Sequence, residues 1–248
     1  MSIIARIKSA WNTKREVFYE AFLVIVVIVF AGWLRCFCYL NEPTICRDAI
    51  QYLHQVENWP NNIYTLPLYQ GVLFRLTQLG IPAHSAALWM GMICGTLLPL
   101  AIYLLTRELT TSRFSAFVAA LLIAVNPRLV KLSFEMLRDM PFWLLVACGW
   151  WLSAVSLKRR RRTAATAAGF CFGLAAWLRY ESVEAILITL AAACLFVPKG
   201  PSKWRDIRRS ACYSFCGFVC AMPFAMIVCG LPLDFYFLFV RTFYYRFF

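Results

Sequence analysis

Charged side chains are scarce in this sequence, and their scarcity decides its class. Asp, Glu, Lys and Arg make up only 15% of the 248 residues, whereas 62% are hydrophobic and the mean hydropathy is +0.66. Soluble domains are about 45–50% apolar, so a soluble globular fold is excluded. We expect an all-α integral membrane protein in which residues 1–248 form a single membrane domain.

Several kinds of functional site are also missing from the sequence. It has neither a Gly-rich phosphate loop nor a Ser-His-Asp set, and its two histidines, His54 and His84, are expected at the surface rather than on a metal. Its 11 cysteines do not form a zinc pattern. Cys212, Cys216 and Cys220 share one helix face inside an apolar segment, which is typical of small packing residues. No nucleotide-hydrolysing, triad-hydrolase or zinc-binding function is indicated.

The few charges are unequally divided, with 25 basic and 12 acidic residues and a net charge of +13. The basic residues cluster between apolar segments, which indicates membrane topology rather than nucleic-acid binding. With the N-terminus in the cytoplasm, inner segments 1–20, 106–113, 158–163 and 199–210 hold 16 of the 25 Lys and Arg, and 8 of the 12 acids lie outside. The run "KRRRR" then anchors the protein to anionic membrane lipids.

The apolar segments number about seven, if about 20 residues are needed to cross the hydrocarbon core. The first segment shows no signal-cleavage site. No eukaryotic sorting signal is evident and the asparagines of the first outer loop lack the glycosylation sequon, so we predict a bacterial inner membrane. The expected spans are 18–40, 83–106, 114–125, 140–157, 164–178, 183–198 and 211–229, with an outer loop at 41–82 and an aromatic interfacial segment at 230–248.

Three of these spans are too short for a hydrocarbon core of about 30 Å. Spans 114–125, 164–178 and 183–198 each have an inner end fixed by Arg or Lys, so their outer ends should stop below the outer surface. Polar segments follow at that depth, where they are tolerated only beside a wet cavity or inside protein. We therefore expect a recessed outward cavity; it should carry Arg138, Asp139, Arg179 and Glu181.

The first outer loop contains two amphipathic helical patterns. From Arg47 to Trp59, apolar residues recur on one helical face, and a second helical stretch covers 66–79. We expect both to lie on the outer membrane surface. Asp48 falls in the first turn of the first one, where the helix dipole favours an ionised carboxylate that can serve as a general base.

The arrangement resembles the GT-C superfamily of membrane glycosyltransferases, and most nearly the branch of protein O-mannosyltransferases and the aminoarabinose transferase of lipid A. Asp48 and Tyr52 match the Asp-Glu-x-x-Tyr type motif that opens the family's first outer loop. The segment "TLPLYQGVLFRLTQLGIP" resembles its second juxtamembrane helix. The segments "NPRLVKLSFEMLRDMPFWLL" and "GLAAWLRYESVEAIL" resemble its second outer loop and its short fifth-to-sixth turn, with Arg179 at the basic position.

The resemblance implies transfer of a sugar from a polyprenyl-phosphate carrier to an acceptor at the outer, periplasmic or luminal, face. Asp48 would be the base of an inverting single displacement. Arg138 and Arg179 would hold the lipid phosphate, because guanidinium grips phosphate bidentately. Asp139 would position the acceptor or hold Arg138. The remaining residues would bind the substrate. Arg47 would screen the charge of Asp48 or contact the carrier, and Tyr52 and Glu181 would contact the carrier or its sugar.

No obligatory cofactor is implied. Some superfamily members use a divalent metal held by an Asp-x-Asp in the second outer loop, but this chain has Glu135 and Asp139 there, so a metal is not favoured. The second acid of the first motif is Ala49. The sequence stops at Phe248, where usual family members continue, so we expect either a minimal form or a protein partner that completes the acceptor site.

Other interpretations of the same residues stay open. Asp48 is also what a helix start favours, Asp139 is also a common helix cap, and Arg179 with Glu181 also suits a structural ion pair. At the level of function, the alternative is a non-catalytic subunit, or a lipid-carrier-binding or flippase protein of a glycan assembly pathway. A transporter often has two similar halves, and no clear internal repeat is present.

Overall fold

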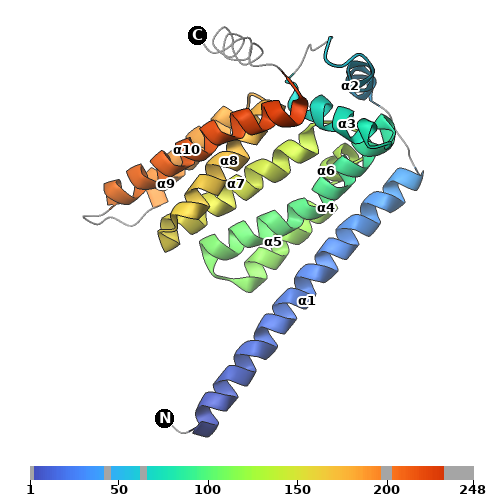
Figure 1. The fold of residues 1–248 in the computed structure, drawn as a ribbon. Coiled ribbons are helices and arrows are strands. Elements are labelled where there is room, and N and C mark those ends of the chain that lie inside the picture. The colour runs from blue at the N-terminus through green and yellow to red at the C-terminus, as the bar shows by residue number, and fades with distance from the viewer. Residues whose placement is uncertain (1–2, 42–45, 62–65, 197–202, 232–248) are drawn as a thin grey trace.

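The computed structural model describes residues 3–41, 46–61, 66–196 and 203–231, and within these ranges every regular element is a helix (Figure 1). The expected all-α class is therefore confirmed for the described residues. The predicted interfacial segment 230–248 lies almost wholly outside them. The helices are α1 Ile3–Asn41, α2 Arg47–Glu57, α3 Leu68–Gln78, α4 Ala83–Thr110, α5 Arg113–Val125, α6 Pro127–Leu132, α7 Asp139–Arg159, α8 Arg162–Leu178, α9 Ser182–Phe196 and α10 Lys203–Cys229.

Each of the seven predicted spans coincides with a helix, but the helices differ in length. Among the described residues, four stretches are long and apolar enough to cross a membrane: Phe18–Asn41 of α1, and α4, α7 and α10. The other three, α5, α8 and α9, have 13, 17 and 15 residues. At about 1.5 Å per residue, α5 is only about 20 Å long. The unequal lengths expected from the sequence are confirmed, whereas the count of seven spans stays a prediction.

The long helices lie in a row (Figure 1). In this row α1 packs on α4 and α5, α4 packs on α7, α7 on α8, and α8 on α10. Helices α2, α3 and α6 gather where one set of ends of these long helices lies, which we call the α2 end of the bundle (Figure 1). The α4–α5 and α7–α8 turns lie at the opposite end, which we call the turn end (Figure 1). Because α7 has 21 residues, the two ends are about 30 Å apart.

Local sequence signals explain where the short helices begin. Ser112 caps α5 by accepting a hydrogen bond from the backbone N–H of Ser115 at 3.2 Å. Asn126 caps α6 in the same way through Leu129 N–H, at 3.2 Å, and Pro127 occupies the first helical position. These caps turn the chain sharply after α5, so α6 is held at the α2 end beside the start of α7.

Helices α2 and α3 present their apolar faces to the bundle. The buried residues of α2 include Ala49, Tyr52 and Val56, and α3 buries Tyr69 and Leu73. Helix α3 packs on α10, α4 and α8 as well as on α2. The two amphipathic patterns of the first loop are thus helices, as expected. Their apolar faces cover the end of the protein core, so protein rather than lipid accounts for the amphipathic pattern.

Glycine allows α8 and α10 to approach each other closely. A Cβ on Gly169 would stand 1.7 Å from the backbone oxygen of Ser214, and one on Gly217 would stand 1.9 Å from that of Thr166. Ser214 also donates a hydrogen bond to the carbonyl of Ala165 at 3.0 Å. Small residues at helix crossings are a usual means of association in membranes. This contact fixes the separation of α8 and α10.

We expect Gly169→Ala to destabilise the protein by about 3 kcal/mol, because the new methyl group can be accommodated only if the two helices move apart. Thermal unfolding of the purified protein in detergent measures the loss. Gly32→Ala is the matched control, since its Cβ would meet its nearest neighbour, the Thr96 side chain, at an ordinary 3.4 Å. Equal melting temperatures for the two variants would contradict the assigned crossing.

Candidate functional site

The start of α7 and the end of α8 bring a carboxylate and a guanidinium together at the α2 end. Asp139 is the first residue of α7 and Arg179 follows the last residue of α8, and these antiparallel helices are packed neighbours. Arg179 forms an ion pair with Asp139. Its other nitrogens bind Glu181 bidentately, at 2.8 Å for Nη2–Oε1 and 3.3 Å for Nε–Oε2. The structural ion pair that the sequence left open for Arg179 and Glu181 is therefore present.

These contacts favour the charged forms of Arg179 and Glu181. The hydrogen bonds from Arg179 hold the pKa of Glu181 below its ordinary value of 4.5. The hydrogen bond to Glu181 in turn raises the pKa of Arg179 above its ordinary value, although burial opposes that rise. Arg179 and Asp139 are half-buried, whereas Glu181 has 49% of its side chain exposed. The Arg179 charge is thus already shared by two carboxylates.

Arg138 differs from Arg179 in its surroundings. It precedes Asp139 in the chain, is half-buried, and makes no ion pair with any residue that the structure describes. Its guanidinium lies over the ring of Tyr52 from α2, 5.7 Å from the ring centroid. The acid that follows it, Asp139, is engaged by Arg179 instead. Arg138 therefore provides positive charge that no carboxylate of the described chain neutralises directly.

Tyr52 of α2 lies among the charged residues Arg138, Asp139 and Arg179, which we call the Asp139 cluster together with Glu181. Its side chain is buried, and its ring packs edge-on against Tyr69 with centroids 5.6 Å apart. Burial raises the pKa of the Tyr52 phenol, Asp48 and Asp139 raise it further, and Arg138 and Arg179 lower it. The phenol therefore stays protonated at neutral pH and can donate a hydrogen bond.

Asp48 and Arg47 lie at the start of α2 and are both exposed. Asp48 is in the first turn of this helix, as expected, one turn before Tyr52, and its charge acts on the Tyr52 phenol. Neither Asp48 nor Arg47 forms a hydrogen bond or an ion pair with a described residue through its side chain. The structure thus brings Arg138, Asp139, Arg179 and Glu181 into direct contact or close proximity, and it places Asp48 at the edge of the same cluster.

The sequence interpretation of Asp139 as a helix cap is not supported, because the N-cap of α7 is Arg138 and Asp139 pairs with Arg179. Glu135 pairs with Lys131 at 3.7 Å, one turn earlier. Among the described residues, no three His, Cys, Asp or Glu side chains gather where they could hold a metal ion.

The recessed cavity expected at these residues does not coincide with either of two pockets found among the described residues. One pocket lies at the turn end, and the other is an apolar space between α1, α4 and α5. At the α2 end the aromatic rings of Tyr52 and Tyr69 occupy space under Arg138, and α2 and α3 cover the bundle. The cluster is a partly buried surface in this conformation.

Two residues that the sequence did not single out position the cluster. Tyr69 is buried in α3 and donates a hydrogen bond to the carbonyl of Met136 at 2.8 Å. Met136 has a φ of 56°, a backbone conformation that is uncommon outside glycine. This bond fixes the turn two residues before Arg138. No local pattern indicates it, because Tyr69 and Met136 are 67 positions apart.

Arg35 is the second missed feature, a fully buried cation within the apolar part of α1. It donates hydrogen bonds to Ala31 O at 2.9 Å and to Ser133 Oγ at 3.0 Å, and a longer one to Ala124 O. It therefore ties α1 to the α5–α6 corner that leads into the cluster. Gly95 leaves room for this contact, since a Cβ there would lie 2.1 Å from Ser133 Oγ. The sequence did contain a signal for Arg35, because a charged residue inside an apolar run is costly and usually has a specific role.

The comparisons with known proteins give one match. A family model described as dolichyl-phosphate-mannose-protein mannosyltransferase matches residues 71–228, which is more than half of the chain. The matched range runs from α3 into α10 and contains Arg138, Asp139, Arg179 and Glu181, whereas Arg47, Asp48 and Tyr52 precede it. No curated protein and no solved structure matches the chain significantly.

Proposed function

Because the chain belongs to the dolichyl-phosphate-mannose-protein mannosyltransferase family, a family of GT-C type membrane glycosyltransferases, we propose that it transfers a sugar from a polyprenyl-phosphate carrier to an acceptor at the α2 end of its bundle. We propose further that this end faces the periplasm or lumen and that the turn end faces the cytoplasm. The basic residues of the α7–α8 turn support this orientation.

The observation that carries the proposal is half-buried Arg138, which has no ion-pair partner among the described residues. Its guanidinium lies over the Tyr52 ring, and its charge acts on Glu181, the partner of Arg179. The leaving group of the reaction is a lipid phosphate, which needs a cation rather than a proton when it departs. Guanidinium offers two parallel N–H donors to phosphate oxygens. We assign this contact to Arg138.

Arg179 has a different role in this proposal. Its nitrogens are occupied by Asp139 and Glu181, and its guanidinium lies 5.7 Å from the ring centroid of Phe142. It holds Asp139 at the start of α7, which fixes the direction in which Arg138 leaves the backbone. It reaches the phosphate only if one of its carboxylates moves. Arg179 is therefore primarily a positioning residue, and its field adds to the positive potential at the cluster.

The chemical step is a single displacement with inversion. The acceptor oxygen or nitrogen forms a bond to the anomeric carbon, the bond between that carbon and the phosphate oxygen breaks, and the phosphate keeps the electron pair. The acceptor proton passes to Asp48. Exposure of Asp48 at the start of α2 makes its carboxylate accessible to an acceptor, as a general base must be. Tyr52 and Glu181 supply hydrogen bonds to the sugar.

The test is transfer by the purified full-length protein in proteoliposomes supplied with polyprenyl-phosphate mannose and with hydroxyl-bearing peptides or lipids as acceptors. We expect labelled mannose on an acceptor and release of polyprenyl phosphate. Binding of the carrier without transfer to any acceptor would contradict catalysis by this chain alone and favour a subunit that needs a protein partner. Movement of labelled carrier between leaflets without transfer would favour the flippase alternative.

A further inference from the structure

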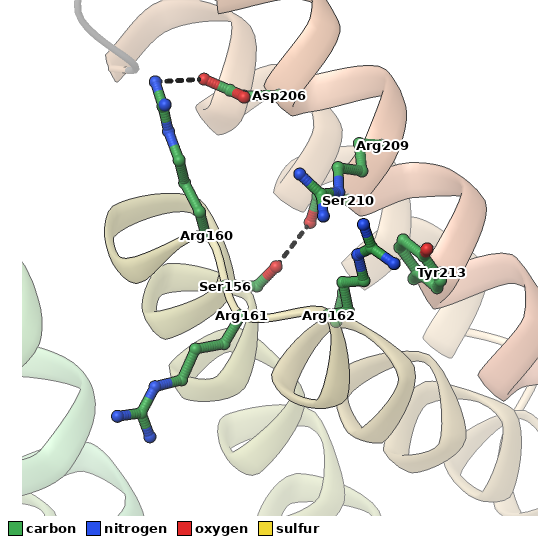
Figure 2. Close-up of a pocket in the computed structure, with 9 residues that line it drawn as sticks. Ser156, Arg160, Arg161, Arg162, Asp206, Arg209, Ser210 and Tyr213 are labelled. Carbon is green, nitrogen blue, oxygen red and sulfur yellow. Dashed lines mark hydrogen bonds and ion pairs between the residues drawn. The ribbon is translucent and has the colours of Figure 1, made fainter.

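A recess at the turn end of the bundle is lined mostly by polar and basic side chains. It encloses about 250 Å³, including its open mouth, between the last turn of α7, the first turn of α8 and the first turns of α10. Four of its lining residues are arginines, at positions 160, 161, 162 and 209, although the side chain of Arg161 points away from the recess (Figure 2). Among the described residues, Asp206 is the one acid that lines it. The recess is about 30 Å from the Asp139 cluster, because Asp139 and Arg159 are the two ends of α7.

The charges in this recess are not balanced. Arg160 turns to one side and pairs with Asp206 at 2.8 Å (Figure 2). The guanidinium groups of Arg162 and Arg209 reach toward Ser210 instead (Figure 2). Arg162 lies over the ring of Tyr213 at 5.6 Å, and no carboxylate lines this side of the recess. The positively charged guanidinium groups of Arg162 and Arg209 therefore line one small space, and their mutual repulsion is unfavourable without a counter-anion.

Hydroxyl groups complete the same side. Ser156 of α7 is buried and Ser210 of α10 is half-buried, and their Oγ atoms are 3.0 Å apart. Helix α8 begins at Arg162 with no side-chain cap, so its first N–H groups add positive potential. The close glycine contact between α8 and α10 holds these donors at a fixed separation. The recess is thus a preformed set of cationic and hydroxyl donors.

We propose that this recess binds a phosphate group, between Arg162 and Arg209 and within reach of the two serine hydroxyls. The proposal is independent of sugar transfer at the α2 end. The phosphate can belong to an anionic phospholipid or to a soluble phosphate in the surrounding aqueous phase. The lipid source is supported by position, because the recess lies where α7 ends, and α10 exposes Trp204 and Phe215 nearby, each with 68% of its surface accessible.

The test compares a double variant, Arg162→Gln with Arg209→Gln, with Arg161→Gln. Arg161 is a neighbour in the same turn, but its guanidinium points away from the recess (Figure 2). The full-length protein in neutral detergent is titrated with short-chain phosphatidylglycerol, with phosphatidylcholine and with inorganic phosphate, and tryptophan fluorescence reports binding. All four arginines of this recess are exposed, so the variants should fold, and thermal unfolding checks that they do.

We expect wild type to bind phosphatidylglycerol in preference to phosphatidylcholine, the double variant to bind it on the order of tenfold more weakly, and Arg161→Gln to resemble wild type. Binding of inorganic phosphate with the same dependence, but not of phosphatidylglycerol, would support the site and identify a soluble source. The proposal is overturned if wild type binds neither anion, or if Arg161→Gln weakens binding as much as the double variant. If the double variant unfolds, Arg209→Lys is tested in its place. This variant keeps the positive charge but loses the planar guanidinium fork, so it should still bind phosphate more weakly than wild type. Unchanged binding by Arg209→Lys would overturn the proposal.

Discussion

Replacement of Asp48 by Asn should reduce sugar transfer by about 10²–10⁴-fold, the range that a positioned general base contributes. The change removes the proton acceptor and keeps the size of the side chain. Asp48 is exposed and forms no hydrogen bond with a described residue through its side chain, so the fold should be unaffected. Transfer in proteoliposomes measures the loss, and carrier binding should remain close to wild type.

Glu57→Gln is the matched control, because Glu57 is an exposed acid at the other end of the same helix. Removal of its charge changes the net charge of α2 by the same amount but leaves the cluster intact. Transfer by Asp48→Asn at the wild-type rate would exclude Asp48 as the base and would turn attention to Asp139, the other carboxylate of the cluster. Equal losses in both variants would indicate a general charge effect.

Replacement of Arg138 by Gln should lower the transfer rate by about 10²–10³-fold, by analogy with the loss of one donor that stabilises a developing anion. The phosphate gains charge as the glycosidic bond breaks, so the contact strengthens in the transition state. The main effect is therefore expected on kcat rather than on KM. Initial rates over a range of carrier concentrations separate the two.

Two further variants make the Arg138 prediction specific. Arg138→Lys keeps the charge but loses the planar fork, so it should recover only part of the activity. Arg128→Gln removes an exposed arginine from α6, in the same loop between α5 and α7, and should leave transfer unchanged. Full activity in Arg138→Gln would refute the phosphate contact, and loss of folding in that variant would instead assign Arg138 a structural role over the Tyr52 ring.

Secondary structure was largely accessible from the sequence, because each predicted span is a run of apolar residues bounded by strong local signals. The caps are a further local feature: the structure starts α5 just after Ser112 and α6 at the Asn126–Pro127 pair, although α6 was not among the predicted elements. The amphipathic period of residues 47–59 likewise predicts α2, although it could not reveal whether lipid or protein covers the apolar face. For the neighbouring helix α3, protein covers the apolar face, because α3 packs on α4, α8 and α10.

The candidate site was only partly accessible. The residue types at 138, 139 and 179 could be named, since charges beside apolar runs are costly and thus noticeable. The ion pair between Asp139 and Arg179 could not be predicted from the sequence. These residues are 40 positions apart and meet only when α7 and α8 pack antiparallel. The proposed division of roles, in which two carboxylates neutralise Arg179 and Arg138 binds an anion, rests on that packing. The same is true of Tyr69, whose bond to Met136 joins α3 to a turn far along the chain.

The sequence by itself determined that this protein is a helical membrane protein of the glycosyltransferase type, and where most of its helices begin and end. Hydrophobic length and helix-start residues act over a few turns, so a linear pattern records them. Only the tertiary structure decided that Arg138 has no ion-pair partner among the described residues, that Arg162 and Arg209 line one recess, and which serines and tyrosines lie beside them. Ion pairs and close glycine contacts depend on distances between helices, and those distances exist only once the bundle is assembled.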